Sequence, residues 1–468
     1  MKLNNPDDDA FFNALRSKEY NRLDELGHVY LDYTGGNLYP QCLINKHLLH
    51  LKNEVYGNPH SVNPTSLLSG ECISRTRERV LEYFNASAYY CIFTSNASGA
   101  LQIVGECYPF SQESCFLLTV DNHNSVNGIR EYCRAKGGTV IYSLIDQGDL
   151  SINETGLTKN LEVHSNHGEK LFAYPAQSNV SGVRHSLEWI RKAHEWGWDV
   201  LLDAAAFVPT SALDLSVYKP DFVSVSFYKI FGYPTGLGCL LVKKSKFDKL
   251  KKPWFSGGTI LLSAVKYNGR FLKRDHERFE NGTVNYLDIP AISYGLDFIE
   301  SIGMANINRR IKDLSQAVLS GLSALKHDNG KALIILYGPK EVENRGGTFV
   351  FNFQDLCGVY YTLNYIEKLA GRHKISLRTG CFCNPGIDEL NHKITKEQLQ
   401  KYFDGRIYGD YDEFIEFLGK TRGAVRLSIG IATTVADIEK FMLFAKMLLN
   451  KTIKTDISET LVCRAEVA

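Results

Sequence analysis

Short apolar runs and amphipathic stretches follow one another along most of the chain. Apolar runs at 200–202 and 222–225 predict buried strands, because each is followed at once by polar or small residues. Apolar residues within 70–86 recur at helical spacing, which predicts a helix with one buried face. These residues are Ile73, Val80, Leu81 and Phe84. Strands that alternate with helices are typical of an α/β domain with a largely parallel sheet.

A second helix signal lies near the C-terminus. Thr434 is followed three residues later by Asp437, which resembles a capping box in which aspartate replaces the usual glutamate. The helix that this box opens carries Ile438, Phe441 and Leu448 on one face.

Ligands of open α/β sheets bind outside the carboxyl ends of the strands, so the residues just after each apolar run are the first candidates. The segment 93–100 holds Ala97 and Ser98 in a small-residue loop that opens a helix. Free backbone N–H groups and the positive end of the helix dipole make such a loop a binding site for an anion such as phosphate. The alternative is an ordinary helix cap, which Ser/Asn/Gly clusters also form.

Two further strand ends carry ionisable residues. His123 is suited to stacking on an aromatic cofactor or to carrying protons, and the alternative is a purely structural histidine. Asp203 follows three apolar residues and precedes three alanines. A carboxylate in such surroundings requires a cationic partner, for which a protonated pyridine nitrogen would serve. The alternative is an aspartate that caps the following helix.

Lys229 lies among apolar and aromatic residues after another strand, in a Ser-x-x-Lys-x-x-Gly context. Desolvation lowers the pKa of a lysine and makes its amine available for Schiff-base chemistry. The alternative is a lysine whose stem packs on the strand end while its ammonium reaches solvent. The order along the chain favours the functional interpretation. A phosphate loop, a histidine and Asp203 precede the lysine, which follows Asp203 by 26 residues (229 minus 203).

Composition narrows the class of ligand. The 468 residues carry 53 lysines and arginines against 52 aspartates and glutamates, a formal net charge of +1, which argues against a general nucleic-acid-binding surface. No run of 18 or more apolar residues predicts a membrane span, and the acidic N-terminus does not resemble a signal peptide. We therefore expect a cytoplasmic protein whose eleven cysteines are mostly reduced, with a small molecule or a protein as its partner.

Several further motifs point to a family. They lie at 30–32, 56–61, 174–179, 279–283 and 378–386, the last reading Arg-Thr-Gly-Cys-Phe-Cys-Asn-Pro-Gly. Together with the strand ends, they resemble class V aminotransferase-fold enzymes, and most closely the N-terminal desulfurase domain of molybdenum-cofactor sulfurases. The resemblance covers nearly the whole chain. It implies the fold of type I pyridoxal-phosphate (PLP) transferases, an α/β fold in which a large domain has a mainly parallel, seven-stranded sheet and a smaller domain is α+β.

The resemblance also implies how the chain is divided. We expect a large PLP-binding domain over 30–300 and a small domain formed by 1–29 together with 301–468. Complete molybdenum-cofactor sulfurases carry a further C-terminal domain that binds the molybdenum cofactor. This chain ends at 468, soon after the last predicted helix, so we expect that domain to be missing.

Roles for the cofactor-binding residues follow from the same resemblance. Lys229 matches the lysine that forms the Schiff base with PLP, and Asp203 matches the partner of the pyridine nitrogen. His123 matches the residue that stacks on the ring and helps proton transfer. Asn179 matches a residue near the phenolic oxygen and the substrate. The residues that match phosphate contacts are Ala97, Ser98, Ser226 and Tyr228, the last at a position where many relatives have a histidine.

Two more residues point to the substrate and to a second subunit. Arg426 matches the arginine that holds the substrate carboxylate, a task that suits its planar, bidentate guanidinium, and the alternative is a surface ion pair. Thr283 matches a threonine that reaches the phosphate of the neighbouring subunit, which implies a homodimer. Ala206, in contrast, stands where many relatives have a polar residue that bonds the phenolic oxygen.

The pair Cys381 and Cys383 carries the reaction that the resemblance implies. In a desulfurase, a thiolate on a mobile loop attacks the substrate sulfur, which leaves a persulfide on the enzyme and releases alanine. Cys383 aligns with the persulfide-forming cysteine, and Cys381 is the weaker candidate. Arg378 offers positive charge, and glycines at 380 and 386 offer backbone freedom. The pair has no further cysteine or histidine partners nearby, so we expect no metal site.

After 384–386 the sequence departs from the sulfurase pattern, and the charged and aromatic stretch up to about residue 421 resembles an insertion. The leading hypothesis is a PLP-dependent cysteine desulfurase that converts L-cysteine to L-alanine and passes the persulfide sulfur of Cys383 to an acceptor protein. The alternative is another PLP-dependent C–S lyase, an epimerase or an aminotransferase of specialised metabolism. A non-catalytic binding module is disfavoured, because Lys229 and Asp203 are both present.

Overall fold

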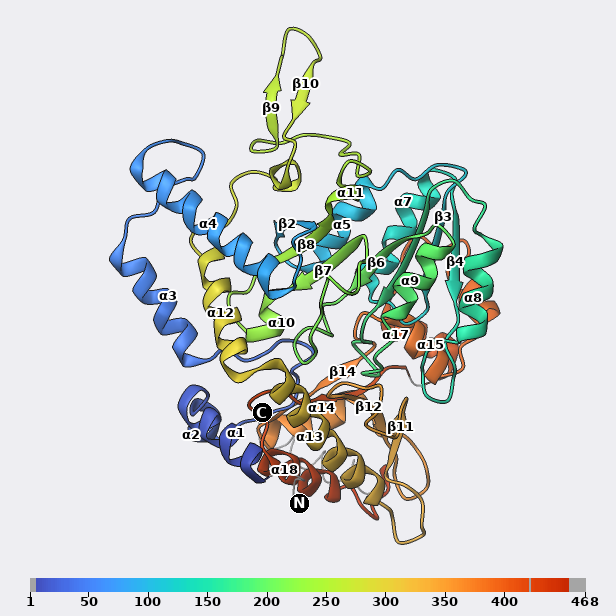
Figure 1. Ribbon diagram of the computed structural model, residues 1–468. Helices are drawn as coiled ribbons and strands as arrows, with labels where there is room; N and C mark the ends of the chain where they lie inside the picture. The colour runs from blue at the N-terminus through green and yellow to red at the C-terminus, as the bar shows by residue number, and fades with distance from the viewer. Residues whose placement is uncertain (1–5, 421, 454–468) are drawn as a thin grey trace.

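The large sheet has seven strands, and most of the predicted site residues follow their carboxyl ends. Figure 1 shows where this sheet lies in the molecule. The computed structural model describes residues 6–420 and 422–453. In the order in which they are hydrogen-bonded, the strands are β2 (Tyr89–Thr94), β8 (Gly238–Lys243), β7 (Phe222–Ser226), β6 (Asp199–Asp203), β5 (Lys170–Pro175), β3 (Cys115–Thr119) and β4 (Thr139–Ser143). Within this sheet only β8 runs antiparallel to its neighbours, so the carboxyl ends of the other strands share an edge. This confirms the mainly parallel, seven-stranded sheet and the strands predicted at 200–202 and 222–225.

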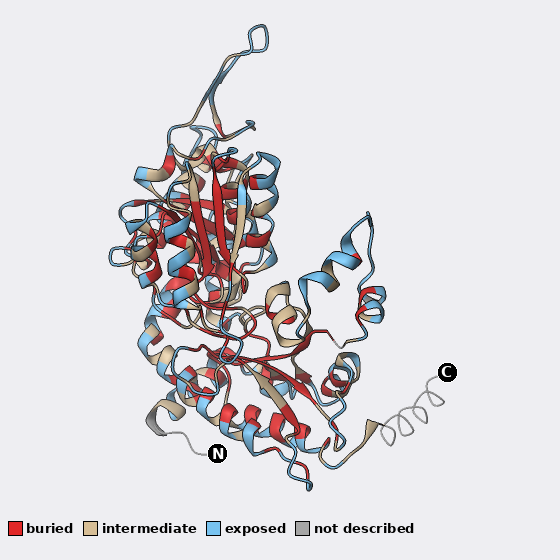
Figure 2. Ribbon diagram, turned by 90° about the vertical axis from the view of Figure 1, so that its right-hand side faces the viewer, coloured by how far each residue is buried: buried red, intermediate tan, exposed pale blue. Residues whose placement is uncertain are grey.

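Successive side chains of each strand point to opposite faces of this sheet, and helices cover both faces. In β3, Cys115 and Leu117 pack in one core cluster while Phe116 and Leu118 pack in another. The helices that add buried side chains are α4 (Pro64–Tyr83), α9 (Glu188–Glu195) and α12 (Ile289–Ile302) on the first face, and α5 (Ala97–Cys107) and α7 (Ile129–Ala135) on the second. The central strands are therefore buried, as Figure 2 shows.

The helix predicted at 70–86 is α4, but its bounds differ from the prediction. The helix begins at Pro64, which fits the first helical turn, and the Asn63 side chain accepts a hydrogen bond from Ser66 N at 3.0 Å. It ends at Tyr83. The apolar periodicity marked the buried face, whereas the start of the helix depends on a polar cap that carries no periodicity.

A second, smaller sheet has four antiparallel strands. In hydrogen-bonded order these are β11 (Ile334–Tyr337), β12 (Thr348–Phe353), β15 (Ala424–Ser428) and β14 (Arg378–Gly380). The helices α13 (Met304–Ala324), α14 (Leu363–Arg372) and α18 (Val435–Lys446) belong to the same part of the chain. The N-terminal segment joins it, because β1 (Val29–Tyr30) pairs in parallel with β13 (Ile375–Ser376) and α1 (Pro6–Glu19) packs on α13. The smaller α+β unit is thus present, and its boundaries at 1–29 and 301–468 stay a prediction.

The capping box predicted at Thr434 opens α18. Thr434 Oγ1 accepts a hydrogen bond from Asp437 N at 3.3 Å, and Asp437 Oδ2 accepts one from Thr434 N at 2.9 Å. Arg16 Nη1 donates to the same carboxylate at 2.6 Å, which ties α1 to this box. Leu448 is buried but lies beyond Lys446, the last residue of the helix. The predicted start of the helix is therefore confirmed, and its predicted extent to Leu448 is wrong.

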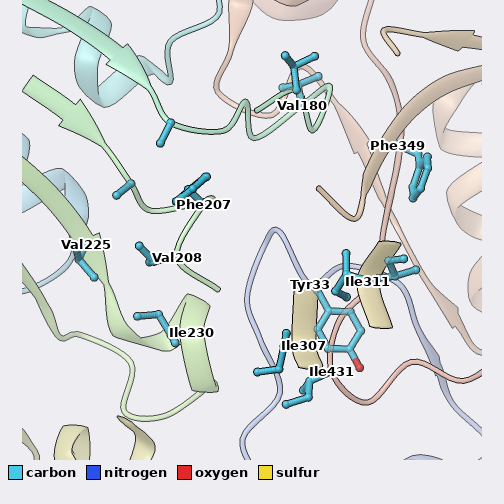
Figure 3. Close-up of a cluster of buried hydrophobic side chains, with 14 of the residues drawn as sticks. Tyr33, Val180, Phe207, Val208, Val225, Ile230, Ile307, Ile311, Phe349 and Ile431 are labelled. Atoms are coloured by element: carbon cyan, nitrogen blue, oxygen red, sulfur yellow. The ribbon is translucent and has the colours of Figure 1, made fainter. Parts of the chain in front are cut away.

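One cluster of buried apolar side chains connects the two sheets (Figure 3). It includes Val225 of β7 and Ile230, which lie on either side of Lys229 in the chain, and Phe349 of β12. Its other labelled members are Tyr33, Val180, Phe207, Val208, Ile307, Ile311 and Ile431. The two sheets therefore share a hydrophobic core next to the predicted Schiff-base lysine.

Two further segments lie outside the two sheets. The hairpin of β9 (Ile260–Ser263) and β10 (Arg270–Leu272) projects at the top of the molecule in Figure 1, and Figure 2 shows it exposed. The stretch predicted as an insertion is helical, with a small core of its own formed by Tyr402, Phe414 and Leu418. Its helices are α15 (Pro385–Asn391), α16 (Lys396–Phe403) and α17 (Tyr411–Leu418). Among the described residues, no helix is both long and apolar enough to cross a membrane.

Gly386 lies in the first turn of α15, against the end of β3. A Cβ atom built on Gly386 would stand 1.9 Å from the carbonyl oxygen of Val120, so only glycine permits this approach. The backbone freedom predicted for Gly386 is therefore not its role here, because the residue is helical and tightly packed.

We expect Gly386→Ala to displace α15 and to lower the free energy of unfolding by about 1–3 kcal/mol, because an overpacked site relaxes only by moving the backbone. Gly371→Ala is the matched control. Gly371 also lies in a helix, α14, and no atom lies within 4 Å of its added Cβ, so the free energy of unfolding should rise by about 0.5–1 kcal/mol. Denaturant unfolding measures both changes, and similar effects of the two substitutions would contradict the packing described for α15.

Candidate active site

Five loops that follow parallel strands converge at the carboxyl edge of the large sheet. In the order β2, β3, β5, β6 and β7, they carry Ala97 with Ser98, His123, Asn179, Asp203, and Ser226 with Lys229. Strand ends that share an edge bring their loops together. Three of them, His123, Asp203 and Lys229, lie within electrostatic reach of one another, since Asp203 acts on the pKa values of both His123 and Lys229.

Lys229 lies in α10 (Phe227–Phe231), a short helix that begins directly after β7. Burial lowers the pKa of its ammonium group, Asp203 opposes this shift, and Arg426 and Arg378 add to it. The net direction is downward, so this amine loses its proton more readily than that of an exposed lysine. The uncharged amine is the form that condenses with a carbonyl group, so the position suits Schiff-base chemistry.

Asp203 ends β6 with a fixed carboxylate. Its Oδ1 accepts hydrogen bonds from Ser224 Oγ at 2.9 Å and from Ala205 N at 3.1 Å. Among the described residues the carboxylate forms no ion pair, although its charge raises the pKa values of His123 and Lys229. A half-buried carboxylate that lacks a cationic partner in the chain fits a protonated ring nitrogen as that partner.

His123 is the N-cap of α6 (Asn124–Asn127), and its Nδ1 accepts a hydrogen bond from Ser125 N at 3.1 Å. Because a backbone N–H only donates, the neutral ring carries its proton on Nε2. Burial lowers the pKa of the imidazole; Asp203 opposes this shift, and Lys229 adds to it. The ring is therefore uncharged at neutral pH, which suits stacking on a cationic heteroaromatic ring and proton transfer at Nε2.

The loop after β2 gathers hydrogen-bond donors. The Asn96 side chain caps α5, so this loop does form the helix cap that was given as the alternative. Ala97 N donates to Ser226 Oγ at 2.9 Å, which leaves the Ser226 hydroxyl hydrogen for another acceptor. Ser98 Oγ lies 2.6 Å from Ser125 Oγ. Hydroxyl groups from three loops thus meet at the first turn of a helix, where an anion is favoured.

For two of the predicted phosphate contacts, Tyr228 and Thr283, the surrounding hydrogen bonds do not indicate an anion site. The Tyr228 carbonyl oxygen accepts a hydrogen bond from Asn37 N at 3.2 Å. Thr283 is exposed, and its Oγ1 accepts a hydrogen bond from Asn58 Nδ2 at 3.2 Å. This bond joins two motifs, at 56–61 and 279–283, that were singled out separately in the sequence. The phosphate roles of Tyr228 and Thr283 stay predictions.

Arg426 lies in β15 and is buried, with 3% of its surface exposed, so the alternative of a surface ion pair does not hold. Its Nη2 donates to Asp32 Oδ1 at 2.8 Å, and its Nη1 donates to Asn179 O at 3.0 Å. Its Nε is buried without a hydrogen-bond partner among the described residues. The Phe382 ring centroid lies 4.8 Å from the guanidinium carbon. The guanidinium is therefore fixed while part of its donor set stays available.

Asp32 is a site residue that the sequence did not single out. Arg378 donates to Asp32 Oδ2 through Nε at 2.9 Å and Nη2 at 2.7 Å, while Arg426 occupies Oδ1. One carboxylate thus positions two arginines, from β14 and β15. Asp32 stands in the motif at 30–32, but its partners are 346 and 394 residues away in the chain, so no spacing could reveal them.

Cys383 lies in a turn that is docked on the edge of the large sheet. Cys383 O accepts a hydrogen bond from Asn124 N at 2.6 Å, and Phe382 O accepts one from Asn179 Nδ2 at 2.8 Å. Phe382 and Cys383 both have left-handed backbones, with φ of 55° and 54°. Such strain in non-glycine residues persists only where the surroundings hold it. The flexible loop predicted for Cys383 is therefore a docked turn in this structure, and Cys383 itself is exposed.

Asn384 is a second site residue that the sequence did not single out. Its side chain is fully buried, and its Nδ2 donates to Asp121 O at 2.6 Å and to Asn179 Oδ1 at 3.0 Å. Its Oδ1 accepts a hydrogen bond from Ile387 N at 3.4 Å, which caps α15. Asn384 therefore joins the cysteine turn to two strand-end loops and to the helix that follows.

Cys381 is held differently from Cys383. Its Sγ lies 3.0 Å from Tyr411 Oη of α17. Burial raises the pKa of the Cys381 thiol to about 11, and the charge of Asp388 adds to the shift. Such a thiol is protonated at neutral pH and is a weak nucleophile. The contact with α17 and the burial of its thiol thus make Cys381 the poorer candidate for the nucleophile, and the exposed Cys383 the better one.

The chain matches the family model of aminotransferase class-V over residues 29–441. It is 37% identical over 470 residues to the molybdenum cofactor sulfurase of Oryza sativa subsp. japonica, and 37% identical over 457 residues to that of Homo sapiens. Each alignment covers 92% of this chain, but 57% of the rice protein and 50% of the human protein. The chain thus spans little more than half the length of these relatives.

Two solved structures share the fold. A cysteine desulfurase from Thermococcus onnurineus NA1, in its apo form, has a TM-score of 0.77 at 22% identity, with 96% of this chain and 98% of that chain covered. The cysteine desulfurase CsdA from Escherichia coli has a TM-score of 0.72 at 18% identity, with 96% and 100% covered. The chain therefore belongs to the aminotransferase class-V family of PLP-dependent enzymes, is related over most of its length to molybdenum cofactor sulfurases, and shares its fold with these two cysteine desulfurases.

Proposed function

We propose that this chain binds PLP on Lys229 and converts L-cysteine to L-alanine, with the sulfur held as a persulfide on Cys383 and passed to an acceptor protein. One observation carries the proposal. Cys383 is exposed, and its carbonyl oxygen accepts a hydrogen bond from Asn124 N, the residue next to His123. This places the cysteine turn at the same edge of the large sheet from which the segment with Lys229 begins. The named relatives, molybdenum cofactor sulfurases and cysteine desulfurases, support the same reaction class.

The residues at this edge fit PLP. The carboxylate of Asp203 would pair with the ring nitrogen, and the uncharged His123 would cover one face of the ring. Asn179 has one amide hydrogen in use, to Phe382 O, so its second would serve the phenolic oxygen, which the Ala206 methyl group cannot do. The phosphate would bind at Ala97, Ser98, Ser226 and Tyr228. When bound, PLP supplies an electron sink that stabilises negative charge on the substrate.

Arg426 is the group that would hold the carboxylate of the amino acid. Its hydrogen bonds to Asp32 and Asn179 use two of the five guanidinium N–H groups, and the buried Nε–H is among those left. A carboxylate that reaches this fork gains charge-assisted hydrogen bonds away from water. The fixed orientation of the fork lowers the entropy lost when the substrate binds.

Lys229 and His123 are placed to move protons. The lowered pKa of Lys229 makes its amine a base for the hydrogen on the substrate α-carbon. His123 is uncharged and carries its hydrogen on Nε2. A proton that it takes up is therefore readily returned, because burial favours the uncharged ring. Burial around both groups keeps bulk water from competing for these protons.

The sulfur step needs Cys383 as a thiolate. Its sulfur attacks the thiol sulfur of the substrate, a new S–S bond forms, and the bond between the substrate sulfur and its β-carbon breaks. The electron pair of that bond stays with the carbon and is finally taken up by a proton. L-Cysteine and the Cys383 thiol thus become L-alanine and the Cys383 persulfide, and no external oxidant or reductant is consumed.

We also propose that the enzyme works as a homodimer in a reducing compartment such as the cytoplasm. Thr283 and its partner Asn58 are surface residues, so they are available to a second copy and to its phosphate. None of the ten cysteines in the described ranges forms a disulfide, which agrees with reducing conditions.

The persulfide mechanism predicts different fates for two cysteine variants. Cys383→Ala should lower alanine release from L-cysteine by at least about 100-fold, because the nucleophile is lost, while the absorbance of bound PLP stays. Cys381→Ala is the matched control and should keep most of the activity, since its thiol is protonated and covered by Tyr411. Alanine and sulfide are both measured with a reductant present. Sulfide release that survives Cys383→Ala would favour a C–S lyase over a desulfurase.

The positioning role of Asp32 is tested by substrate binding. Asp32→Asn removes the charge that orients Arg426 and Arg378, so we expect the KM for L-cysteine to rise by about tenfold with a smaller change in kcat. Asp24→Asn breaks an Arg–Asp pair elsewhere, with Arg16, and should leave the KM unchanged. Steady-state kinetics of both variants separate a local effect from a general one. An unchanged KM in Asp32→Asn would contradict the role given to Arg426.

A further inference from the structure

A cysteine and two histidines gather at the opposite edge of the large sheet from the active site. Cys115 is the first residue of β3, and its side chain is fully buried. His164 caps the end of α8 (Glu154–Val163), and His167 lies in the turn that leads from α8 into β5. One ligand atom of each residue lies within 4.8 Å of those of the other two.

This cluster is separate from the active site. The PLP-site loops follow the carboxyl ends of the parallel strands, whereas Cys115 begins β3 and His167 precedes β5. A five-residue strand is about 17 Å long, so the body of the sheet lies between the two places. The two sites therefore share no residue, and neither cysteine of the pair at 381–383 takes part.

The surroundings of the two histidines suit metal ligands. His167 Nδ1 lies 3.2 Å from the carbonyl oxygen of Glu113, to which it can only donate, so Nε2 keeps its lone pair for a metal. Metal-binding histidines usually donate their second ring N–H to a carbonyl or carboxylate in this way. Among the described residues, the ring of His164 has no hydrogen-bond partner, and its centroid lies 5.6 Å from that of His167.

The chain around the cluster adds negative charge and a rigid base. Glu113 forms no ion pair among the described residues, and its Oε2 lies 3.6 Å from a Cβ atom built on Gly168, beside the histidine turn. Cys115 N donates to Glu169 O at 2.9 Å, and Gly168 N donates to Glu113 O at 2.9 Å. The start of β3 and the histidine turn are therefore tied together by backbone bonds, so a metal would bind between segments that are already neighbours.

We propose that Cys115, His164 and His167 form a binding site for a divalent zinc ion, with water as the fourth ligand. A thiolate with two imidazoles is a donor set that zinc takes in tetrahedral geometry. That geometry needs ligand atoms about 3.3–3.6 Å apart, so the side chains must draw in by about 1 Å. The two histidines are half-buried on a turn, so this movement falls to them and to the turn, whereas Cys115 is fixed in the strand. Burial raises the pKa of the Cys115 thiol to about 12, so the metal itself must displace this proton, which leaves to solvent on binding.

No spacing along the chain indicates this site, and the expectation from the sequence was that no metal site is present. Cys115 precedes His164 by 49 residues and His167 by 52 (164 minus 115 and 167 minus 115). The three residues meet because β3 and β5 are adjacent parallel strands, whose starts share an edge just as their ends do. A zinc ion here would cross-link the end of α8 to the start of β3 and so stabilise that edge of the sheet.

The test is zinc binding to the full-length protein with PLP bound, after removal of metals with a chelator. We expect equilibrium dialysis against zinc and elemental analysis to find one tightly bound zinc ion per chain. His164→Gln and His167→Gln should each weaken binding by about 100-fold or more, since each removes a direct ligand. His28→Gln is the matched control, because His28 is exposed and far from the cluster in the chain, and it should bind zinc as the wild type does.

Two further measurements keep the result specific. A Cys381→Ser/Cys383→Ser variant should keep the zinc ion, which separates this site from the active-site thiols. Cobalt in place of zinc should give a thiolate-to-metal charge-transfer band that Cys115→Ser removes, and the histidine variants decide the question if Cys115→Ser fails to fold. A wild-type chain that retains no zinc, or histidine variants that bind it as tightly as the wild type, would overturn the proposal.

Discussion

The enclosure of the Lys229 amine at the carboxyl edge of a parallel sheet is the constraint on which this structure depends. Burial disfavours the charged form of the amine, and the charges of Arg426 and Arg378 act in the same direction. Asp203 opposes them but forms no ion pair among the described residues. Asp32 is ion-paired with both arginines, so Asp203 is the carboxylate of this site that lacks a cationic partner among the described residues, and a cofactor with a protonated ring nitrogen would supply one.

The two sheets meet at this edge through a few buried contacts. Asn384 bonds to both Asp121 O and Asn179 Oδ1, and Arg426 bonds to Asn179 O and Asp32. Most of these partners are buried, so each unmade hydrogen bond would cost about 1–3 kcal/mol. The strain of two successive left-handed residues at Cys383 is thereby maintained. The turn that carries Cys383 thus depends on Asn179 and Asn384, which lie beside the proposed cofactor site.

Much of this arrangement was predictable from the sequence, for a physical reason. Apolar runs mark buried strands, and the topology of a parallel sheet places the residues after them at one edge, which brought His123, Asp203 and Lys229 together. The helix at 70–86 and the helix that begins after Thr434 were also predicted, although both bounds of the first and the end of the second were misjudged. Helix ends depend on side-chain caps and packing, such as Asn63 at the start of α4, and apolar periodicity does not contain that information.

Other features were out of reach because they depend on contacts between distant segments. Asp32 meets Arg378 and Arg426 from the far end of the chain, and no local pattern records such a pair. Gly386 looked like a flexible point in the loop, whereas its missing side chain permits close packing on Val120. Cys383 was preferred to Cys381 on the family resemblance alone, and the physical difference between them, the contact of Cys381 with Tyr411, comes from a helix about 30 residues further along the chain. Contacts between distant segments therefore decide which of the two thiols is exposed and how the guanidinium of Arg426 is oriented.

The central claim is that Lys229 is the residue that binds the cofactor covalently. Reduction of the purified yellow protein with sodium borohydride makes the bond between PLP and its lysine permanent, and peptide mapping by mass spectrometry then locates it. We expect a single pyridoxyl-phosphate group, on the peptide that contains Lys229. A group on a different lysine, or no modified peptide from protein that had bound PLP, would contradict it.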